Sequence, residues 1–223
     1  MTIFSKPVFA PALLALFLAA GWAGGPTNGL EVSVMEGFAA IRSSWPPLAS
    51  MAAALTRLGG AHMTLGLTAA AALWLLLRRA PGRALLLVST VLVERSAVEW
   101  LKVLTERPRP DFGVEWLPHS LAFPSGHSAN SMTAFLAVAL IAAPPEFRRT
   151  AAISAVALSV LVGLTRICLG VHWPSDIIGG WAFGLLAVSA AVAVGQHAGL
   201  LHVKPQHKIV GGHGAALDED EAA

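Results

Sequence analysis

Two segments of the sequence each carry a histidine beside residues that could begin a helix. They are FPSGHSAN, residues 123–130, and TRICLGVHWPSD, residues 165–176. In the second segment Asp176 follows His172 by four positions. Its carboxylate can accept a hydrogen bond from one ring nitrogen and leave the lone pair of the other nitrogen free to act as a nucleophile. His127, in the first segment, is free to act as an acid. This pattern predicts nucleophilic catalysis by His172, with His127 protonating the leaving group.

Permanent positive charges accompany these histidines. The stretch EWLKVLTERPRPDF, residues 99–112, places six charged side chains in fourteen positions of a chain that is only 13% charged. Lys102, Arg109 and Arg166 together imply an anionic ligand, and phosphate is the natural candidate because guanidinium groups grip its oxygens with paired hydrogen bonds. Phosphoryl transfer without a metal needs a nucleophile, an acid and fixed positive charge. No group of residues has obvious metal-ligand spacing, so we expect neither a metal nor a cofactor.

Backbone N–H groups are expected to contribute to the same anion site. Pro124 and Pro174 each suit the first turn of a helix, where a missing N–H group costs nothing. Ser125 and Gly126 would then direct free N–H groups and the positive end of the helix dipole at the anion. Gly126 lets an oxygen approach the backbone closely, and Ser125 can add a hydroxyl donor. We therefore predict that both residues bind phosphate.

The two neighbouring Arg-Pro pairs are not equivalent in this interpretation. In a helix, seven steps bring Arg109 back to within about 20° of Lys102, whereas five steps leave Arg107 about 140° away. We therefore expect Arg109 to hold phosphate. Arg107 is then free to pair with Glu106 or Asp111, or to meet lipid headgroups.

The elements that position these residues are expected to be membrane-spanning helices. The chain has 223 residues, 55% of them hydrophobic, and a mean hydropathy of +0.65. Ordinary soluble domains are about 45–50% apolar and about 25% charged. The net charge of +2 gives no reason to expect nucleic-acid binding, and the single cysteine, Cys168, excludes an intrachain disulfide framework. The predicted fold is an all-α integral membrane bundle.

About six apolar segments can form this bundle. Several are shorter than the ~20 residues that a helix needs to cross about 30 Å of hydrocarbon, so the segments between them must extend them. The first has a rival interpretation as a cleaved signal peptide, but its long apolar run favours a retained helix. We expect one domain over residues 1–203, with its motifs within 102–176, and a polar, disordered cytoplasmic tail at 204–223. The apolar segments are 8–24, 61–77, 84–101, 128–143, 151–165 and 177–195.

Three further patterns concern the arrangement of the helices. Residues 30–41 have an apolar face, Leu30, Val34, Phe38 and Ile41, that predicts either a helix in the membrane interface or one packed on the bundle. The spacing of Gly180 and Gly184 either allows close helix packing or arises by chance. Arginines in the turns 78–83 and 144–150 predict that these turns are cytoplasmic. The motif segments would then share the opposite face, toward the periplasm or exterior.

The motif segments resemble the three signature motifs of the type 2 phosphatidic acid phosphatase family of integral-membrane lipid phosphatases. The resemblance covers about residues 84–195. Thr165 stands where the third motif usually has Ser, and a hydroxyl is kept. The family's K-x6-R-P matches Lys102, Arg109 and Pro110, its P-S-G-H matches Pro124 to His127, and its S-R-x5-H-x3-D matches Arg166, His172 and Asp176.

The resemblance implies a metal-independent reaction with a six-helix core. His172 would become a phosphohistidine held by Asp176, and His127 would protonate the leaving group. The implied partner is a lipid phosphate or pyrophosphate, of the undecaprenyl pyrophosphate, phosphatidic acid, phosphatidylglycerol phosphate or lipid A type, in a bacterial inner membrane. The implied phosphate-binding residues are Lys102, Arg109, Ser125, Gly126 and Arg166.

Other function classes remain open at this point. A phosphotransferase would pass the phosphoryl group from the same site to another lipid. A non-catalytic lipid-phosphate binder would not need both histidines and Asp176. An intramembrane serine protease using Ser125 would leave the cations unexplained. Vanadium haloperoxidases share the motifs, but they are soluble proteins.

Overall fold

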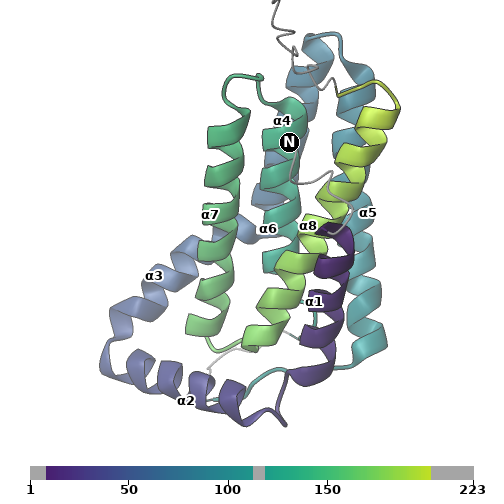
Figure 1. The fold of residues 1–223 in the computed structure, drawn as a ribbon. Coiled ribbons are helices and arrows are strands. Elements are labelled where there is room, and N and C mark those ends of the chain that lie inside the picture. Colours follow the sequence, from purple (N-terminus) through teal and green to yellow (C-terminus); the bar gives the residue numbers. More distant parts are fainter. Residues whose placement is uncertain (1–8, 113–118, 202–223) are drawn as a thin grey trace, which may run out of the picture.

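The computed structural model describes residues 9–112 and 119–201, so the predicted tail lies outside the described residues. The described part of the chain consists of helices joined by irregular connections and has no strand, which confirms the all-α prediction (Figure 1). The elements are α1 (Phe9–Ala23), α2 (Gly29–Ser44), α3 (Pro46–Thr56), the 3-10 helix η1 (Arg57–Gly59), α4 (Ala61–Leu77), α5 (Pro81–Thr105), α6 (Gly126–Ala137), the π-helix η2 (Val138–Ala142), α7 (Arg148–Cys168) and α8 (Pro174–His197).

Every predicted apolar segment corresponds to a helix: α1, α4, α5, α6 with η2, α7 and α8. Three helical segments in the described ranges are both long and apolar enough to cross a membrane: 46–77, α7 and α8. Residues 9–23 and 126–142 form shorter apolar helices. The segment 46–77 is longer than predicted because α3 and η1 continue into α4. The sequence did not reveal α3.

The central helix of the bundle is α6, which packs against α5, α7 and α8 (Figure 1). Two glycines of α8 allow this helix to approach closely. A Cβ atom at Gly180 would lie 2.7 Å from the carbonyl oxygen of Ser125, and one at Gly184 would lie 2.8 Å from that of Ala129. Of the two interpretations of the glycine spacing, the structure therefore supports close helix packing.

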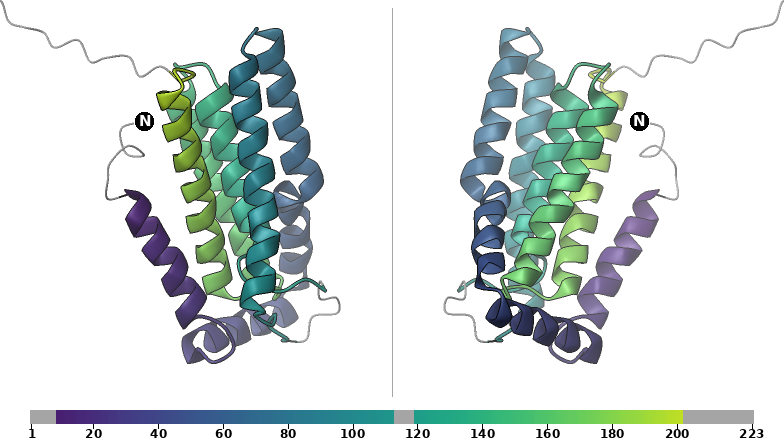
Figure 2. Two further views of the ribbon diagram at one scale, coloured as in Figure 1. Left: turned by 90° about the vertical axis from the view of Figure 1, so that its right-hand side faces the viewer. Right: turned by 90° about the vertical axis from the view of Figure 1, so that its left-hand side faces the viewer.

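The amphipathic helix α2 lies across one end of the bundle, where α5 and α7 end and α8 begins (Figures 1 and 2). Its buried residues are Glu31 and Met35. Leu30 is 80% exposed, and Val34 and Ile41 are also exposed. The helix thus docks on the bundle through one face and presents apolar side chains on another. Packing on the bundle is confirmed, and a position in the membrane interface stays a prediction.

The opposite end of the bundle carries the arginine-bearing turns. The turn between α4 and α5 and the connection from η2 to α7 both lie away from α2 (Figure 2). The helix arrangement therefore confirms that these turns are on the opposite side from the segments that carry the motifs.

Candidate active site

A cavity of about 380 Å³ lies at the α2 end of the bundle. The structure brings the side chains or backbone of most predicted site residues to its wall, although they come from three different helices and two loops. Asp176 is buried behind His172 instead, and Ser125 does not line the cavity. The lining residues are Gly59, Ala61, Arg95, Glu99, Lys102, Arg109, Ser120, Gly126, His127, Asn130, Arg166 and His172.

Asp176 holds the imidazole of His172 from the side away from Arg109. His172 Nδ1 lies 3.2 Å from Asp176 Oδ2, and His172 Nε2 lies 2.9 Å from Arg109 Nη1. A guanidinium group can only donate, so Nε2 must accept, and Nδ1 carries the proton that it donates to Asp176. Burial lowers the pKa of His172 well below its ordinary value, and the cations of Arg109, Arg166 and Lys102 lower it further. The ring is therefore neutral, with its lone pair on Nε2.

The start of α8 fixes the position of Asp176. Pro174 occupies the first turn of the helix, as predicted, and Asp176 follows in the same turn. Asp176 Oδ2 also accepts a hydrogen bond of 2.9 Å from the backbone N–H of Trp173. The indole N–H of Trp173 in turn donates to the carbonyl of Pro108 at 2.9 Å. The segment of the first motif is thereby attached to the segment of the third.

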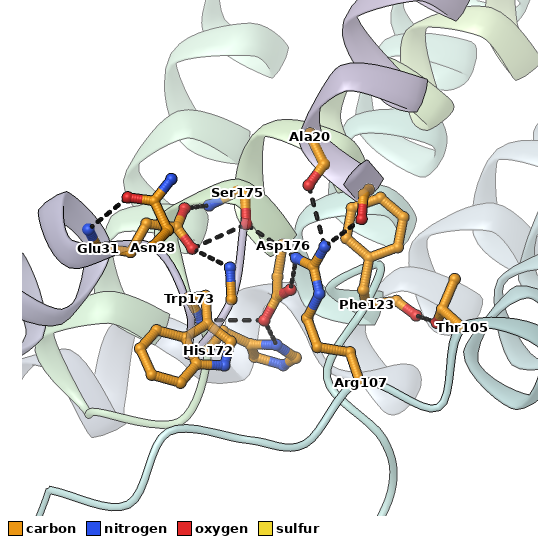
Figure 3. A network of polar contacts seen from close by, with 12 residues as sticks. Ala20, Asn28, Glu31, Thr105, Arg107, Phe123, His172, Trp173, Ser175 and Asp176 are labelled. Carbon is orange, nitrogen blue, oxygen red and sulfur yellow. Dashed lines mark hydrogen bonds and ion pairs between the residues drawn. The ribbon is translucent and has the colours of Figure 1, made fainter. Parts of the chain in front are cut away.

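Arg107 forms the second contact of Asp176. Arg107 Nη1 lies 2.9 Å from Asp176 Oδ1 and 2.8 Å from the hydroxyl of Ser175 (Figure 3). Arg107 Nη2 donates to the carbonyls of Ala20, at 3.1 Å, and Gly21, at 2.6 Å, near the end of α1. This guanidinium group therefore joins α1, α8 and the predicted catalytic carboxylate.

These contacts show that the prediction for Arg107 is wrong. It pairs with neither Glu106 nor Asp111, and it is buried rather than directed at headgroups. The helical angles used for the prediction do not apply, because α5 ends at Thr105 and Glu106 adopts the left-handed conformation, with φ of 46°. Arg109 still reaches the cavity, but through an irregular segment and not along a helix face.

Arg109 is held in front of His172 by neighbouring backbone. Arg109 Nε donates to the carbonyl of Ser120 at 2.6 Å, and Nη1 donates to that of Val171 at 2.6 Å. Arg109 Nη2 adds a 2.9 Å hydrogen bond to the Ser120 hydroxyl. Burial lowers the pKa of Arg109, yet an arginine remains charged in proteins. No sequence pattern indicated that Ser120 would orient it.

Lys102 and Gly126 meet at the junction of α5 and α6. A Cβ atom at Gly126 would lie 3.4 Å from Lys102 Nζ, so the glycine keeps space beside the ammonium group. Because α6 begins here, its first-turn N–H groups have no acceptor within the helix. Lys102 also pairs with Glu99 at 2.8 Å, and Glu99 is 62% exposed. A phosphate that enters the cavity can displace this exposed carboxylate.

Arg166 retains an unused donor at the cavity. Its Nη1 donates to the hydroxyl of Thr56 at 2.9 Å, whereas its buried Nε has no hydrogen-bond partner among the described residues. Thr56, at the end of α3, is a residue that the sequence analysis missed. Thr165, the residue that differs from the family motif, donates to the carbonyl of Val162 and does not line the cavity.

Ser125 differs from its prediction. Its hydroxyl is fully buried and accepts a 3.2 Å hydrogen bond from Ser128, while its backbone N–H donates to the carbonyl of Asp176 at 3.0 Å. It therefore attaches α6 to α8. Pro124 lies before the first turn, because α6 begins at Gly126, so the expectation for this proline is also wrong.

The comparisons with known proteins agree with this arrangement. Residues 83–199 match the PAP2 superfamily. Phosphatidylglycerophosphatase B of Bacillus subtilis is 31% identical over 186 residues, which cover 81% of this chain and 90% of that protein. Lipid A 1-phosphatase of Rhizobium etli is 35% identical over 108 residues, 44% of each chain.

A solved structure agrees as well. The crystal structure of a transmembrane PAP2-type phosphatidylglycerolphosphate phosphatase from Bacillus subtilis matches with a TM-score of 0.78 and 27% identity, over 85% of this chain and 96% of that one. The family match includes all three motif segments and the cavity residues that they supply. The chain therefore belongs to the PAP2 superfamily.

Proposed function

We propose that this membrane phosphatase removes a phosphate group from a lipid through a phosphohistidine formed on His172. One observation carries the proposal. His172 is held by Asp176 through Nδ1, and its Nε2 is directed at Arg109 in a cavity that also contains His127. A neutral imidazole with one nitrogen anchored and the other free to react is a nucleophile, and the neighbouring cations attract a phosphate to it.

The first step forms the phosphoenzyme. An entering phosphate replaces His172 Nε2 as the acceptor of the Arg109 hydrogen bond, and Lys102 and Arg166 bind its other oxygens. Nε2 attacks phosphorus, and the N–P bond forms as the P–O bond to the lipid breaks. His127 gives its proton to the leaving oxygen. The fixed cations stabilise the equatorial oxygens of the transition state.

The second step releases phosphate. His127, now neutral, takes a proton from a water molecule that attacks the phosphohistidine. The N–P bond breaks, its electron pair returns to His172 Nε2, and inorganic phosphate leaves. Asp176 accepts the hydrogen bond from Nδ1–H throughout and stabilises the charge on the ring. His127 is protonated again for the next cycle.

The substrate is a phosphate monoester or pyrophosphate at the headgroup of a lipid. The cavity lies at the α2 end of the bundle, where we expect lipid headgroups to meet the hydrocarbon. The relatives named for phosphatidylglycerophosphate and for lipid A 1-phosphate both imply a terminal phosphate on an apolar anchor. Undecaprenyl pyrophosphate and phosphatidic acid have the same chemistry.

The test uses purified protein and these four lipids. We expect phosphate release from at least one of them, and transient ³²P labelling of the protein that is labile in acid and stable in base. His172→Ala should abolish both signals. His62→Ala, which changes an exposed histidine of α4 away from the cavity, should retain them. Undiminished release by His172→Ala would refute the mechanism, and transfer of label to an added lipid would identify a phosphotransferase.

The arginine-bearing turns face the cytoplasm, and the cavity faces the periplasm or exterior. Positive residues in short connections support this orientation. Single cysteines at Arg79 and Asp111, in a Cys168→Ser background, can be treated with an impermeant thiol reagent in intact cells. We expect labelling at position 111 alone. Labelling at position 79 alone would reverse the orientation.

A further inference from the structure

Glu31 is a buried charged residue that the proposed reaction does not use. It belongs to α2, it is 8% exposed, and it lies at the start of α8 (Figure 3). Glu31 Oε1 accepts a 2.6 Å hydrogen bond from the backbone N–H of Ser175, and Oε2 accepts one of 2.6 Å from the N–H of Gly25. A carboxylate at a helix N-terminus satisfies free N–H groups and is favoured by the helix dipole. Glu31 thus caps α8 from another helix.

The Ser175 hydroxyl connects Glu31 to Arg107. Ser175 Oγ lies 3.0 Å from Glu31 Oε2 and 2.8 Å from Arg107 Nη1. Because arginine can only donate, the hydroxyl accepts from Arg107 and gives its single proton to Glu31. The direction of each hydrogen bond is therefore fixed. A continuous polar chain runs from Glu31 through Ser175 and Arg107 to Asp176, and from there to His172.

This chain restrains the Asp176 carboxylate at both oxygens. Arg107 binds Oδ1, while the ring of His172 and the N–H of Trp173 bind Oδ2. Without Arg107 the carboxylate could rotate away from His172 Nδ1. Without Glu31, Ser175 would have no acceptor for its proton and could turn away from Arg107. A chain of polar contacts thus connects the ring of His172 to a residue of α2.

We infer that Glu31 and Arg107 are positioning residues, which hold Asp176 through Ser175 so that His172 presents Nε2 to the phosphate. The inference rests on the proposed role of His172. Glu31 lies outside residues 83–199, the segment that matches the family. The outer helix α2 is therefore part of the support of the catalytic pair and not only a cover of the bundle end.

Arg42 offers an internal comparison on the same helix. Its Nη1 donates to the carbonyl of Cys168 at the end of α7, and its Nη2 donates to that of Phe112, both at 3.0 Å. It anchors α2 as Glu31 does, but its two hydrogen bonds lead to carbonyls outside the chain from Glu31 to Asp176. A variant of Arg42 therefore loosens the docking of α2 and leaves that polar chain intact.

The experiment measures kcat, KM and thermal unfolding for Glu31→Gln, Arg107→Lys and their double variant, with and without Ser175→Ala. We expect each single variant to lower kcat by roughly 10–100-fold, with KM changed less than about twofold, because the fault lies in the nucleophile and not in phosphate binding. The kcat of the double variant should be no more than about threefold below that of the less active single variant, since both changes break the same chain of polar contacts. When Glu31→Gln is added to Ser175→Ala, kcat should fall by less than about threefold, because the link between Glu31 and Arg107 is already broken.

Two controls on α2 separate positioning from stability. Glu36→Gln changes an exposed carboxylate and should leave kcat unchanged. Arg42→Gln should lower the melting temperature without lowering kcat of the folded protein. An equal loss of kcat in Arg42→Gln, multiplicative effects in the double variant, or full kcat in Glu31→Gln would each overturn the inference.

His172→Ala and Asp176→Asn are assayed beside these variants. If both lose phosphate release while Glu31→Gln retains it, the inference fails and the proposed function stands. If His172→Ala retains phosphate release, the proposed function fails and the inference fails with it.

Discussion

Arg107 Nη1 lies 2.9 Å from Asp176 Oδ1, and the two side chains are only 7% and 0% exposed. This ion pair is separate from the contact between Arg109 and His172, although the two arginines are only two positions apart in the sequence. The two Arg-Pro pairs therefore have different tasks. Arg109 lines the cavity, and Arg107 supports the carboxylate behind it.

Arg107→Ala should reduce both stability and turnover. It leaves Asp176 buried without its charged partner, and breaking a buried pair costs about 3–5 kcal/mol. We expect a loss of stability of this order, and at least about a 10²-fold loss of turnover at equal folded protein, comparable to the removal of an essential donor. The measurements are unfolding in detergent and phosphate release. The exposed neighbour Glu106→Ala should change turnover less than about threefold, as a surface charge typically would. A loss under tenfold in Arg107→Ala would contradict the importance of the ion pair.

Arg109→Ala should lower turnover by roughly 10²–10³, as the loss of one transition-state donor does. Arg109→Lys should recover part of this loss, because it restores the charge but not the paired donors of the guanidinium group. The measurement is kcat with saturating lipid. If Arg109→Ala remains within tenfold of the unchanged protein, this residue does not contact the phosphate in the transition state.

The sequence predicted the residues that line the cavity better than the residues that hold them in place. Lys102, Arg109 and His172, which line one cavity, could be found because their types and spacing are typical of a phosphate site. Arg107 was misassigned because the angles used for the prediction require a helix that continues to residue 109, whereas α5 ends at Thr105. The boundaries of a helix are the part of it that sequence patterns predict least well.

Other supports had no local signal. Thr56, which orients Arg166, is 110 residues away from it in the chain. Glu31 is 144 residues away from Ser175. Such pairs can be identified only in the folded structure, where α3 contacts the last turn of α7 and α2 contacts the first turn of α8. The apolar segments, in contrast, were predictable because hydrophobicity over a long window marks each one.

Gly180→Ala should destabilise the protein. The new Cβ atom would lie 2.7 Å from the carbonyl oxygen of Ser125 and 2.8 Å from the Cβ of Ser128, so α6 and α8 must separate. Overpacking of this kind costs about 1–3 kcal/mol. Gly37→Ala in α2 is the matched control, because nothing lies within 4 Å of its Cβ position. It should be neutral or stabilise by up to about 1 kcal/mol. Equal melting temperatures for the two variants would show that α8 does not need the close approach.

His172 should remain neutral at pH 6. Burial lowers its pKa most, and the nearby cations lower it further, so it binds a proton only well below its ordinary value of 6.5. The unfolded chain binds that proton at a higher pH, so stability from this residue falls as the pH drops below about 6.5. Carbon-13 NMR of labelled histidines in detergent can follow the ring, with His172→Gln to assign its signal. Arg109→Gln removes a neighbouring cation and should raise the pKa of His172, while burial keeps it below the ordinary value. A His172 signal that titrates near 6.5 in the unchanged protein would contradict the neutral nucleophile.

Phosphatase activity should survive EDTA and be inhibited by vanadate. Lys102, Arg109 and Arg166 surround the cavity with fixed positive charge, which supplies the stabilisation of phosphate oxygens that a metal ion otherwise gives. Vanadate can adopt the five-coordinate geometry of phosphorus under attack by His172, so it should compete with the lipid phosphate. The measurement is phosphate release before and after dialysis against EDTA, followed by a vanadate titration of the unchanged protein and of Arg109→Ala. Arg109→Ala should bind vanadate at least about tenfold more weakly, because transition-state analogues lose the same donors as the transition state. Activity that disappears in EDTA and returns with a divalent ion would show that the three cations do not suffice.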